Sequence, residues 1–251
     1  MIKSNRGQVT IFVIIGIVVV VGILLFMFLR EGTSITRQFE ENPKQFIIDC
    51  AEDAVKNSLA VLMANGGEII MSQSIEHYGE SYNYLCYSGD FFRNCYNLHP
   101  MLQYLIESEL REDTRGEVQD CFDSLGGDLQ DKGYEFSADA TDYSIDLLPG
   151  IVRINLDKKI NIVRGNYLQS FENFDSEILS PAYGLVQVTN DIINDETVNC
   201  KFDNYYYMRL NPEQHIKKIN FEDNRFYRLT DRKTGVIFKF AVRNCVLPHG
   251  L

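Results

Sequence analysis

The chain begins with one long apolar run and continues with segments whose hydrophobic residues are regularly spaced. Residues 9–29 contain no charged side chain, and the nearest charges are Arg6 and Arg30. A helix that crosses a bilayer needs about 20 apolar residues, whereas a cleaved secretory leader carries an apolar region of only about 7 to 15. The run therefore predicts a transmembrane helix at residues 8–30, preceded by a short basic leader at residues 1–7.

Helical spacing returns after a polar linker at residues 31–42. Asn42 followed by Pro43 is typical of a helix start, with Asn as the N-cap and Pro at the first helical position. The apolar residues that follow recur at helical intervals and end at Gly66, which is typical of a glycine C-cap. This stripe consists of Ile47, Ala51, Val55, Leu59 and Leu62.

Two further helices are predicted from the same kind of pattern. The first covers residues 100–127, with an interruption near residues 114–116. The second starts at Pro181 or Leu185 and ends at Val198. Proline at the start and paired glycines at the end are common helix boundaries.

Elsewhere hydrophobic and polar residues alternate or cluster in short runs, which predicts β-strands. The predicted strands are residues 134–138, 143–148, 151–156, 159–163, 216–220, 226–229 and 236–242. Turn residues at positions 149–150 and 157–158 separate the first four, which favours one antiparallel meander. The predicted fold class is α+β, with the N-terminal transmembrane helix followed by an ectodomain of about three helices packed on antiparallel sheet.

The ectodomain divides by composition into two parts. Residues 43–130 contain the first two helices and, between them, an aromatic loop that includes Cys86 and Cys95. Residues 131–251 contain the predicted strands and the last helix. The chain has 16 phenylalanines and 14 tyrosines, a content that favours a packed core over a disordered stalk.

The distribution of charge favours an outward-facing ectodomain. Lys3 and Arg6 precede the apolar run, and no acidic residue does. The positive-inside rule then keeps the N-terminus in the cytoplasm and places the C-terminal domain outside the cell. Subtracting Lys3, Arg6 and Arg30 leaves 21 basic and 35 acidic residues in positions 31–251, a net charge of −14. Such a surface repels nucleic acid, which we therefore exclude as a partner.

The residues just before the apolar run resemble a known family. The stretch NRGQVTIF at residues 5–12 resembles the class III signal peptide of archaeal type IV pilin-like proteins. With the apolar segment included, it also resembles uncharacterised single-pass archaeal surface proteins. The resemblance implies cleavage between Gly7 and Gln8 by a prepilin-type peptidase, with the apolar segment retained. Pilin-like chains commonly carry a glutamate at the fifth mature position, and Phe12 stands there, which favours an anchor over a filament subunit.

Six cysteines form an even set, as expected of a protein in an oxidising compartment. Six cysteines allow many connectivities, but their placement favours pairs on the apolar stripes of two helices, around the aromatic loop and around the last helix-to-sheet region. These pairs are Cys50 with Cys121, Cys86 with Cys95, and Cys200 with Cys245. The alternative is that some are buried free thiols, which behave as small hydrophobic residues.

Known catalytic motifs are missing from the sequence. It has no nucleophile elbow, P-loop, HExxH motif or EF-hand loop, and its four histidines are widely scattered. No cysteine or histidine spacing matches a zinc site. We therefore predict no enzymatic activity, no cofactor and no metal.

The aromatic loop is the candidate binding surface. Aromatic side chains make large contacts and lose little conformational entropy, so a cluster of them on a disulfide-closed loop suits recognition of a protein or a glycan. The candidate residues are Tyr82, Tyr84, Tyr87, Phe91 and Phe92. The alternative is ordinary packing in the core.

These features predict a non-enzymatic, membrane-anchored extracellular surface protein with a structural or adhesive role. Its expected partners are the membrane, a prepilin-type peptidase and other surface or pilin-like subunits. One alternative is a subunit of a type IV pilus-like filament or of its assembly apparatus. Another is a ligand-binding receptor or an ectoenzyme.

Overall fold

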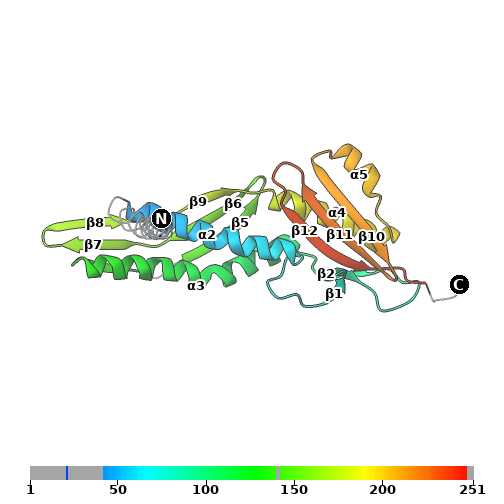
Figure 1. The fold of residues 1–251 in the computed structure, drawn as a ribbon, viewed down its shortest axis with the longest axis horizontal. Coiled ribbons are helices and arrows are strands. Elements are labelled where there is room, and N and C mark those ends of the chain that lie inside the picture. The colour runs from blue at the N-terminus through cyan, green and yellow to red at the C-terminus, as the bar shows by residue number, and fades with distance from the viewer. Residues whose placement is uncertain (1–20, 22–41, 140–141, 248–251) are drawn as a thin grey trace, which may run out of the picture. The chain divides into compact units, whose positions relative to one another are not determined.

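The computed structural model describes Val21, residues 42–139 and residues 142–247. The described part is α+β, with four helices and three sheets (Figure 1). The chain divides into two compact units, residues 1–46 and 47–251, and the second contains all the sheets. The helices are α2 (Pro43–Ala64), α3 (Leu102–Asp131), α4 (Ala182–Asn199) and α5 (Asn204–Leu210).

Helix α2 begins and ends where the sequence predicts. The backbone N–H of Gln45 donates to Asn42 Oδ1 at 3.1 Å, so Asn42 is the N-cap. At the other end the N–H of Gly67 donates to the carbonyl of Leu62 at 2.8 Å. Gly66 and Gly67 have φ angles of 72° and 99°, a left-handed conformation that glycine adopts without strain.

Helix α3 is continuous over 30 residues, so the predicted interruption near residues 114–116 is wrong. Thr114 is buried, and its hydroxyl donates to the carbonyl of Leu110 at 2.6 Å and lies 2.7 Å from the Tyr143 hydroxyl. The polar group is therefore satisfied inside the protein and does not break the helix. The helix also continues past Gly126, where the ring of Phe136 on strand β4 (Glu135–Ala138) packs so closely that a Cβ atom would lie 2.7 Å from it.

The largest sheet has the strand order β1-β2-β12-β11-β10, with β3 also paired to β2. Its strands β2 and β12 are parallel, and the other pairs are antiparallel. Helix α4 contacts β2, β3, β11 and β12, and α5 contacts β10. The strands are β1 (Ser74–His77), β2 (Glu80–Tyr87), β3 (Tyr96–Asn97), β10 (Gln214–Phe221), β11 (Asn224–Asp231) and β12 (Ile237–Arg243).

Two smaller antiparallel sheets have the orders β4-β7-β8 and β5-β6-β9, and α3 contacts both. The four predicted strands at residues 134–163 are present, but they do not form one meander. The chain leaves the second sheet between β6 and β7, where Lys158 is buried against the ring of Phe122 on α3. The strands are β4 (Glu135–Ala138), β5 (Asp142–Leu148), β6 (Ile151–Asp157), β7 (Ile160–Arg164), β8 (Tyr167–Phe171) and β9 (Ser176–Leu179).

The predicted fold class, a transmembrane helix followed by about three helices on antiparallel sheet, is wrong. A fourth helix, α5, begins after the N-cap Asp203, whose side chain accepts from the N–H of Tyr206. The sheets number three, and one contains a parallel pair. Within the described ranges, no helix has the length and apolar character needed to cross a bilayer. Apart from Val21, the segment predicted to do so, residues 8–30, lies outside those ranges.

Two adjacent glycines of α3 provide a test of its packing. Gly126→Ala is expected to lower the free energy of unfolding by about 1 to 3 kcal/mol, because the new methyl group overlaps the ring of Phe136. Gly127→Ala is the matched control, since no atom lies within 4 Å of its Cβ position, and it should stabilise by up to about 1 kcal/mol. Chemical denaturation with the disulfides intact measures both values. Equal effects would contradict the close contact.

Candidate functional site

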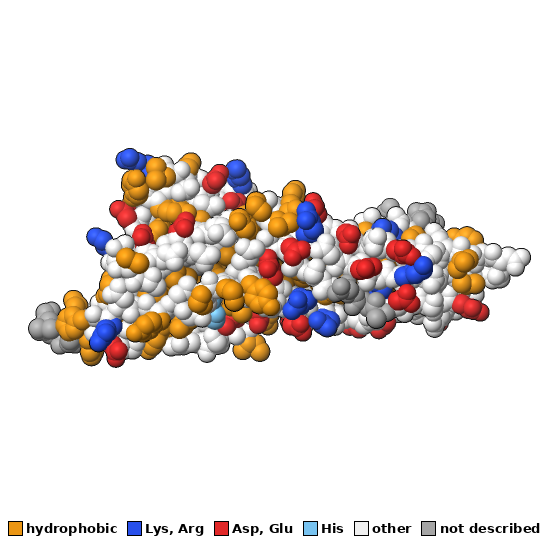
Figure 2. Space-filling view, turned by 180° about the vertical axis from the view of Figure 1, so that it is seen from behind, with side chains coloured by type: hydrophobic (Ala, Val, Ile, Leu, Met, Phe, Trp, Pro, Cys, Tyr) orange, Lys and Arg blue, Asp and Glu red, His pale blue; other side chains and the backbone are white. Residues whose placement is uncertain are grey.

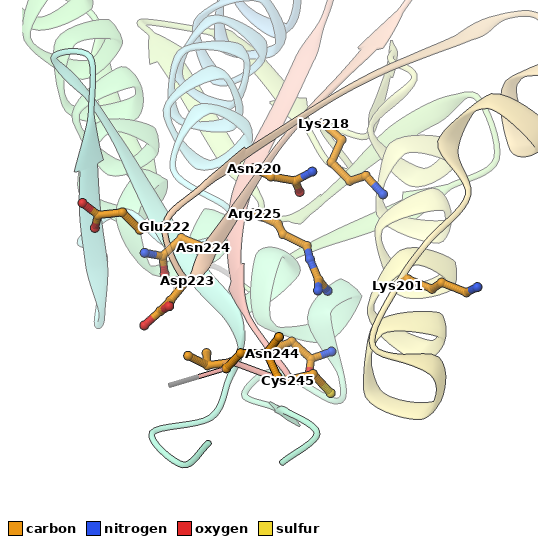
Figure 3. Close-up of a pocket in the computed structure, with 11 residues that line it drawn as sticks. Lys201, Lys218, Asn220, Glu222, Asp223, Asn224, Arg225, Asn244 and Cys245 are labelled. Carbon is orange, nitrogen blue, oxygen red and sulfur yellow. The ribbon is translucent and has the colours of Figure 1, made fainter. Parts of the chain in front are cut away.

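An open pocket of about 540 Å³ lies between the β10–β11 hairpin, the residues after α4 and the end of β12 (Figure 3). Its lining is mostly polar and carries both signs of charge. The basic and amide side chains are Lys201, Lys218, Arg225, Asn220, Asn224 and Asn244.

The register of the hairpin places the main polar residues on one face. Asn220 pairs with Arg225, and Lys218 pairs with Tyr227. Side chains directly opposite each other, and those two residues apart, share a face of a sheet. The face with these four residues is the one that α4 covers, because Arg225 and Tyr227 both contact Glu196 of α4.

The carboxylate of Glu196 is fully buried and has three donors. The Tyr227 hydroxyl donates to Oε1 at 2.5 Å, Arg225 forms an ion pair with Oε2, and Asn244 Nδ2 donates to Oε2 at 3.1 Å. Asn244 also donates to the backbone carbonyl of Glu196. Burial, together with the nearby charge of Glu196, raises the pKa of Tyr227 far above its ordinary range, so this hydroxyl remains a donor. Both oxygens of the Glu196 carboxylate therefore accept from donors of the sheet and of the segment after β12.

Lys218 lies on the same face without a carboxylate of its own. Its ammonium donates to the backbone carbonyl of Phe202 at 2.6 Å. Burial lowers the pKa of Lys218, and the positive charge of Arg225 lowers it further, while Glu196 opposes both effects. Lys201 is exposed at the rim. Among the described residues, its ammonium has neither a hydrogen-bond acceptor nor an ion-pair partner.

A disulfide between Cys200 and Cys245 forms one wall of the pocket. It joins the end of α4 to the segment after β12, with a Cα–Cα distance of 5.8 Å. Both half-cystines have left-handed backbones, with φ angles of 54° and 48°. Asn94 Nδ2 donates to the carbonyls of Thr197 and Val198, at 2.6 and 3.2 Å, and so binds the last turn of α4. This wall is therefore held both by the disulfide and by the hydrogen bonds of Asn94.

At the acidic end of the pocket Asp223 is held by a protein contact, whereas Glu222 is exposed. Asp223 forms an ion pair with Arg243 at 3.2 Å, and Glu222 lies at the exposed turn of the hairpin. Asn224 is buried and accepts a hydrogen bond of 2.6 Å from the Tyr84 hydroxyl. Figure 3 shows Glu222 and Asp223 at the opposite side of the hairpin from Lys218 and Arg225. The basic side is therefore the part of the pocket with unused donors.

The three disulfides that the placement of the cysteines predicted are all present. Cys50–Cys121 joins α2 to α3 with a Cα–Cα distance of 6.1 Å, and Cys86–Cys95 closes the loop after β2 with 5.4 Å. With Cys200–Cys245 these are the pairs that the sequence favoured, and none of the six is a free thiol.

The five aromatic candidates do not share one surface. Tyr82 and Tyr84 are buried and pack in a core cluster with Phe226 and Ala241, and Tyr87 lies half-buried against it. Phe91 and Phe92, in contrast, are 49% and 62% exposed. The spacing of two between Tyr82 and Tyr84 is the signal that places both on one face of a strand.

The predicted processing residues, Gly7 and Gln8, lie outside the described ranges. Sequence reasoning missed the polar pocket, because its lining residues come from three separate segments, which follow α4, form the hairpin and follow β12. Alternation along β10 places the side chains of Lys217 and Lys218 on opposite faces of the sheet. The sequence alone does not show which of these faces packs against a helix. Among residues 42–139 and 142–247, no three metal-binding side chains gather into one group.

The chain was compared with protein-family models, curated proteins and solved structures, and none of them matches it.

The buried ion pair gives a stability prediction. Glu196→Gln is expected to lower the free energy of unfolding by about 3 kcal/mol, because it leaves the half-buried Arg225 without its counter-charge. Glu177→Gln is the control, since Glu177 and Arg153 form an exposed pair at 2.9 Å and its loss should change stability by less than about 1 kcal/mol. Urea denaturation measures both. Similar values for the two variants would contradict the role given to Glu196.

The hydroxyl of Tyr84 gives a pH prediction. Burial raises its pKa from 10.0 to about 12, so the folded protein keeps this proton at pH values where the unfolded chain loses it. The resulting stability is complete below pH 10 and is lost as the pH rises through about 12. Tyr84→Phe should cost about 1 kcal/mol at neutral pH, through the lost hydrogen bond to Asn224, and should make the alkaline decline shallower.

Denaturation series at neutral and alkaline pH measure this effect. The exposed Tyr96→Phe is the control and should retain the stability and the pH profile of the wild type. An unchanged alkaline profile in Tyr84→Phe would show that this hydroxyl is not the responsible group.

Proposed function

We propose that this protein is a membrane-anchored extracellular surface protein with a structural or adhesive role. The observation that carries the proposal is the pairing of all six cysteines in three disulfides. Such bonds persist in oxidising compartments and are rare where thiols are kept reduced. Their distribution over both parts of the ectodomain supports a location of the whole domain outside the cell.

The N-terminal sequence supports attachment to the membrane. The apolar run at residues 9–29 provides the anchor, and Lys3 and Arg6 before it favour a cytoplasmic N-terminus. The resemblance of residues 5–12 to a class III signal peptide supports processing between Gly7 and Gln8. The chain then passes the membrane once and presents its acidic domain to the outside.

The polar pocket supports binding rather than catalysis. Glu196 is the buried carboxylate beside it, and its oxygens are occupied by Arg225, Tyr227 and Asn244. A fully buried carboxylate held by these donors is a poor general base, because a base must come within hydrogen-bond reach of a substrate proton.

Exposed aromatic side chains support an adhesive role. Tyr78, Phe92 and Tyr96 are more than half exposed. Phe92 and Tyr96 lie in or directly after the segment closed by Cys86–Cys95, and Tyr78 lies in the β1–β2 turn at the other end of β2. Figure 2 shows hydrophobic side chains among acidic and basic ones on one face of the molecule. A mixed surface of this kind is usual for interfaces that form reversibly.

The location is tested on intact cells that carry the full chain with a C-terminal tag. Added protease should remove the tag from intact cells and leave a cytoplasmic marker whole. Peptide mapping without reductant should recover the three disulfides, Cys50–Cys121, Cys86–Cys95 and Cys200–Cys245. A tag that resists protease until the cells are permeabilised, together with six thiols that alkylate without reduction, would overturn the proposal.

A further inference from the structure

We propose that the pocket between the β10–β11 hairpin, the residues after α4 and the end of β12 binds an acidic sugar, whose carboxylate is held by Lys218 and Arg225. The inference rests on the proposed surface location, because it assigns a ligand class to an extracellular binding protein. It is carried by the charges, the free donors and the size of the pocket.

The charges on the hairpin face do not cancel. Glu196 neutralises Arg225 in the buried ion pair, whereas the partner of Lys218 among the described residues is the neutral carbonyl of Phe202. Lys218 and Arg225 lie close enough for the charge of Arg225 to lower the pKa of Lys218. Glu196 and Asp203 act on Lys218 without forming an ion pair with it. An anion between Lys218 and Arg225 would relieve their repulsion and give Lys218 a direct counter-charge. Lys201 adds another positive charge at the rim.

The geometry of the donors suits a carboxylate. Arg225 uses Nη1 for Glu196, and a guanidinium has five N–H donors in a planar fork, so donors remain for a ligand. A planar carboxylate matches this fork, and the ammonium of Lys218 can donate to the same oxygens. Figure 3 shows Lys218, Asn220 and Arg225 extending from the hairpin on the same side.

The rest of the lining suits a hydroxylated ligand. Asn220 stands opposite Arg225 in the hairpin register, and amide side chains both donate to and accept from hydroxyl groups. Val246 and Leu247 provide an apolar edge. The volume of about 540 Å³ lies within the usual range of small-ligand sites and accommodates a sugar ring with its substituents. An anionic sugar can contact the basic, the amide and the apolar residues of the lining at the same time.

Equilibrium dialysis of the full chain, in detergent and with its disulfides intact, tests the inference. The probe is radiolabelled D-glucuronate, with D-glucose and inorganic sulfate as competitors. We expect saturable binding that unlabelled glucuronate displaces and glucose does not. Lys218→Gln should weaken binding about tenfold, the effect of losing one charge-assisted hydrogen bond.

Lys217→Gln is the matched control, because Lys217 is the exposed neighbour on the opposite face of β10. It should change affinity by less than about twofold. Lys201→Gln, at the exposed rim, should weaken binding less than Lys218→Gln and cannot act through the core. Circular dichroism and disulfide mapping show whether each variant is folded.

Three results would overturn the inference: no saturable binding, equal losses in Lys217→Gln and Lys218→Gln, or displacement by glucose. Displacement by sulfate as strong as by glucuronate would reduce the site to a general oxyanion pocket and so overturn the sugar assignment. Each of these results leaves the protease test on intact cells unaffected, so failure of the ligand assignment is distinguishable from failure of the proposed location.

Discussion

The buried carboxylate of Glu196 holds together the part of the molecule that contains the pocket. Its donors are Arg225 and Tyr227 of β11 and Asn244 in the segment after β12, so α4 is fixed against the sheet by charge as well as by packing. A buried carboxylate is costly to desolvate, and it is tolerated when its counter-charge and its remaining hydrogen bonds are all present. Arg225 therefore uses one of its nitrogens to stabilise the fold, while Lys218 on the same face donates to the carbonyl of Phe202 and forms no direct ion pair among the described residues.

The parallel pairing of β2 with β12 brings together two strands that are far apart in the sequence. The register joins Tyr84 to Ala241, and the chain between them includes both smaller sheets and α3. Closing so long a loop has a substantial entropic cost, which grows slowly with length. The disulfides Cys86–Cys95 and Cys200–Cys245 lie in or beside these two strands. These two disulfides thus stabilise the region where the pocket is built.

Local patterns were sufficient for elements whose boundaries are set by their own residues. Asn42 and Gly66 determine the ends of α2 through caps within the segment, and these were predicted. The buried Thr114 in α3 is satisfied in part by the Tyr143 hydroxyl, which is distant in the sequence. The continuity of α3 at this position was therefore not predicted. The split of the predicted meander depends on Lys158 being buried against α3, which its charge does not suggest. Nonlocal contacts thus account for the main errors.

The pocket could not be predicted from the sequence, because it too depends on nonlocal contacts. The charge of the surface around it affects which ligands it can bind. The sequence shows Glu196 beside Asp195 as if on a solvated acidic face, and only the register of the hairpin reveals the basic partners. Positions 31–251 carry a net charge of −14, and charges act over roughly 10 Å at moderate salt. A long polyanion would extend from the pocket over this acidic surface and be repelled. The acidic sugar proposed above is a small monoanion that needs only Lys218 and Arg225, so this distribution of charge favours it over a long polyanion.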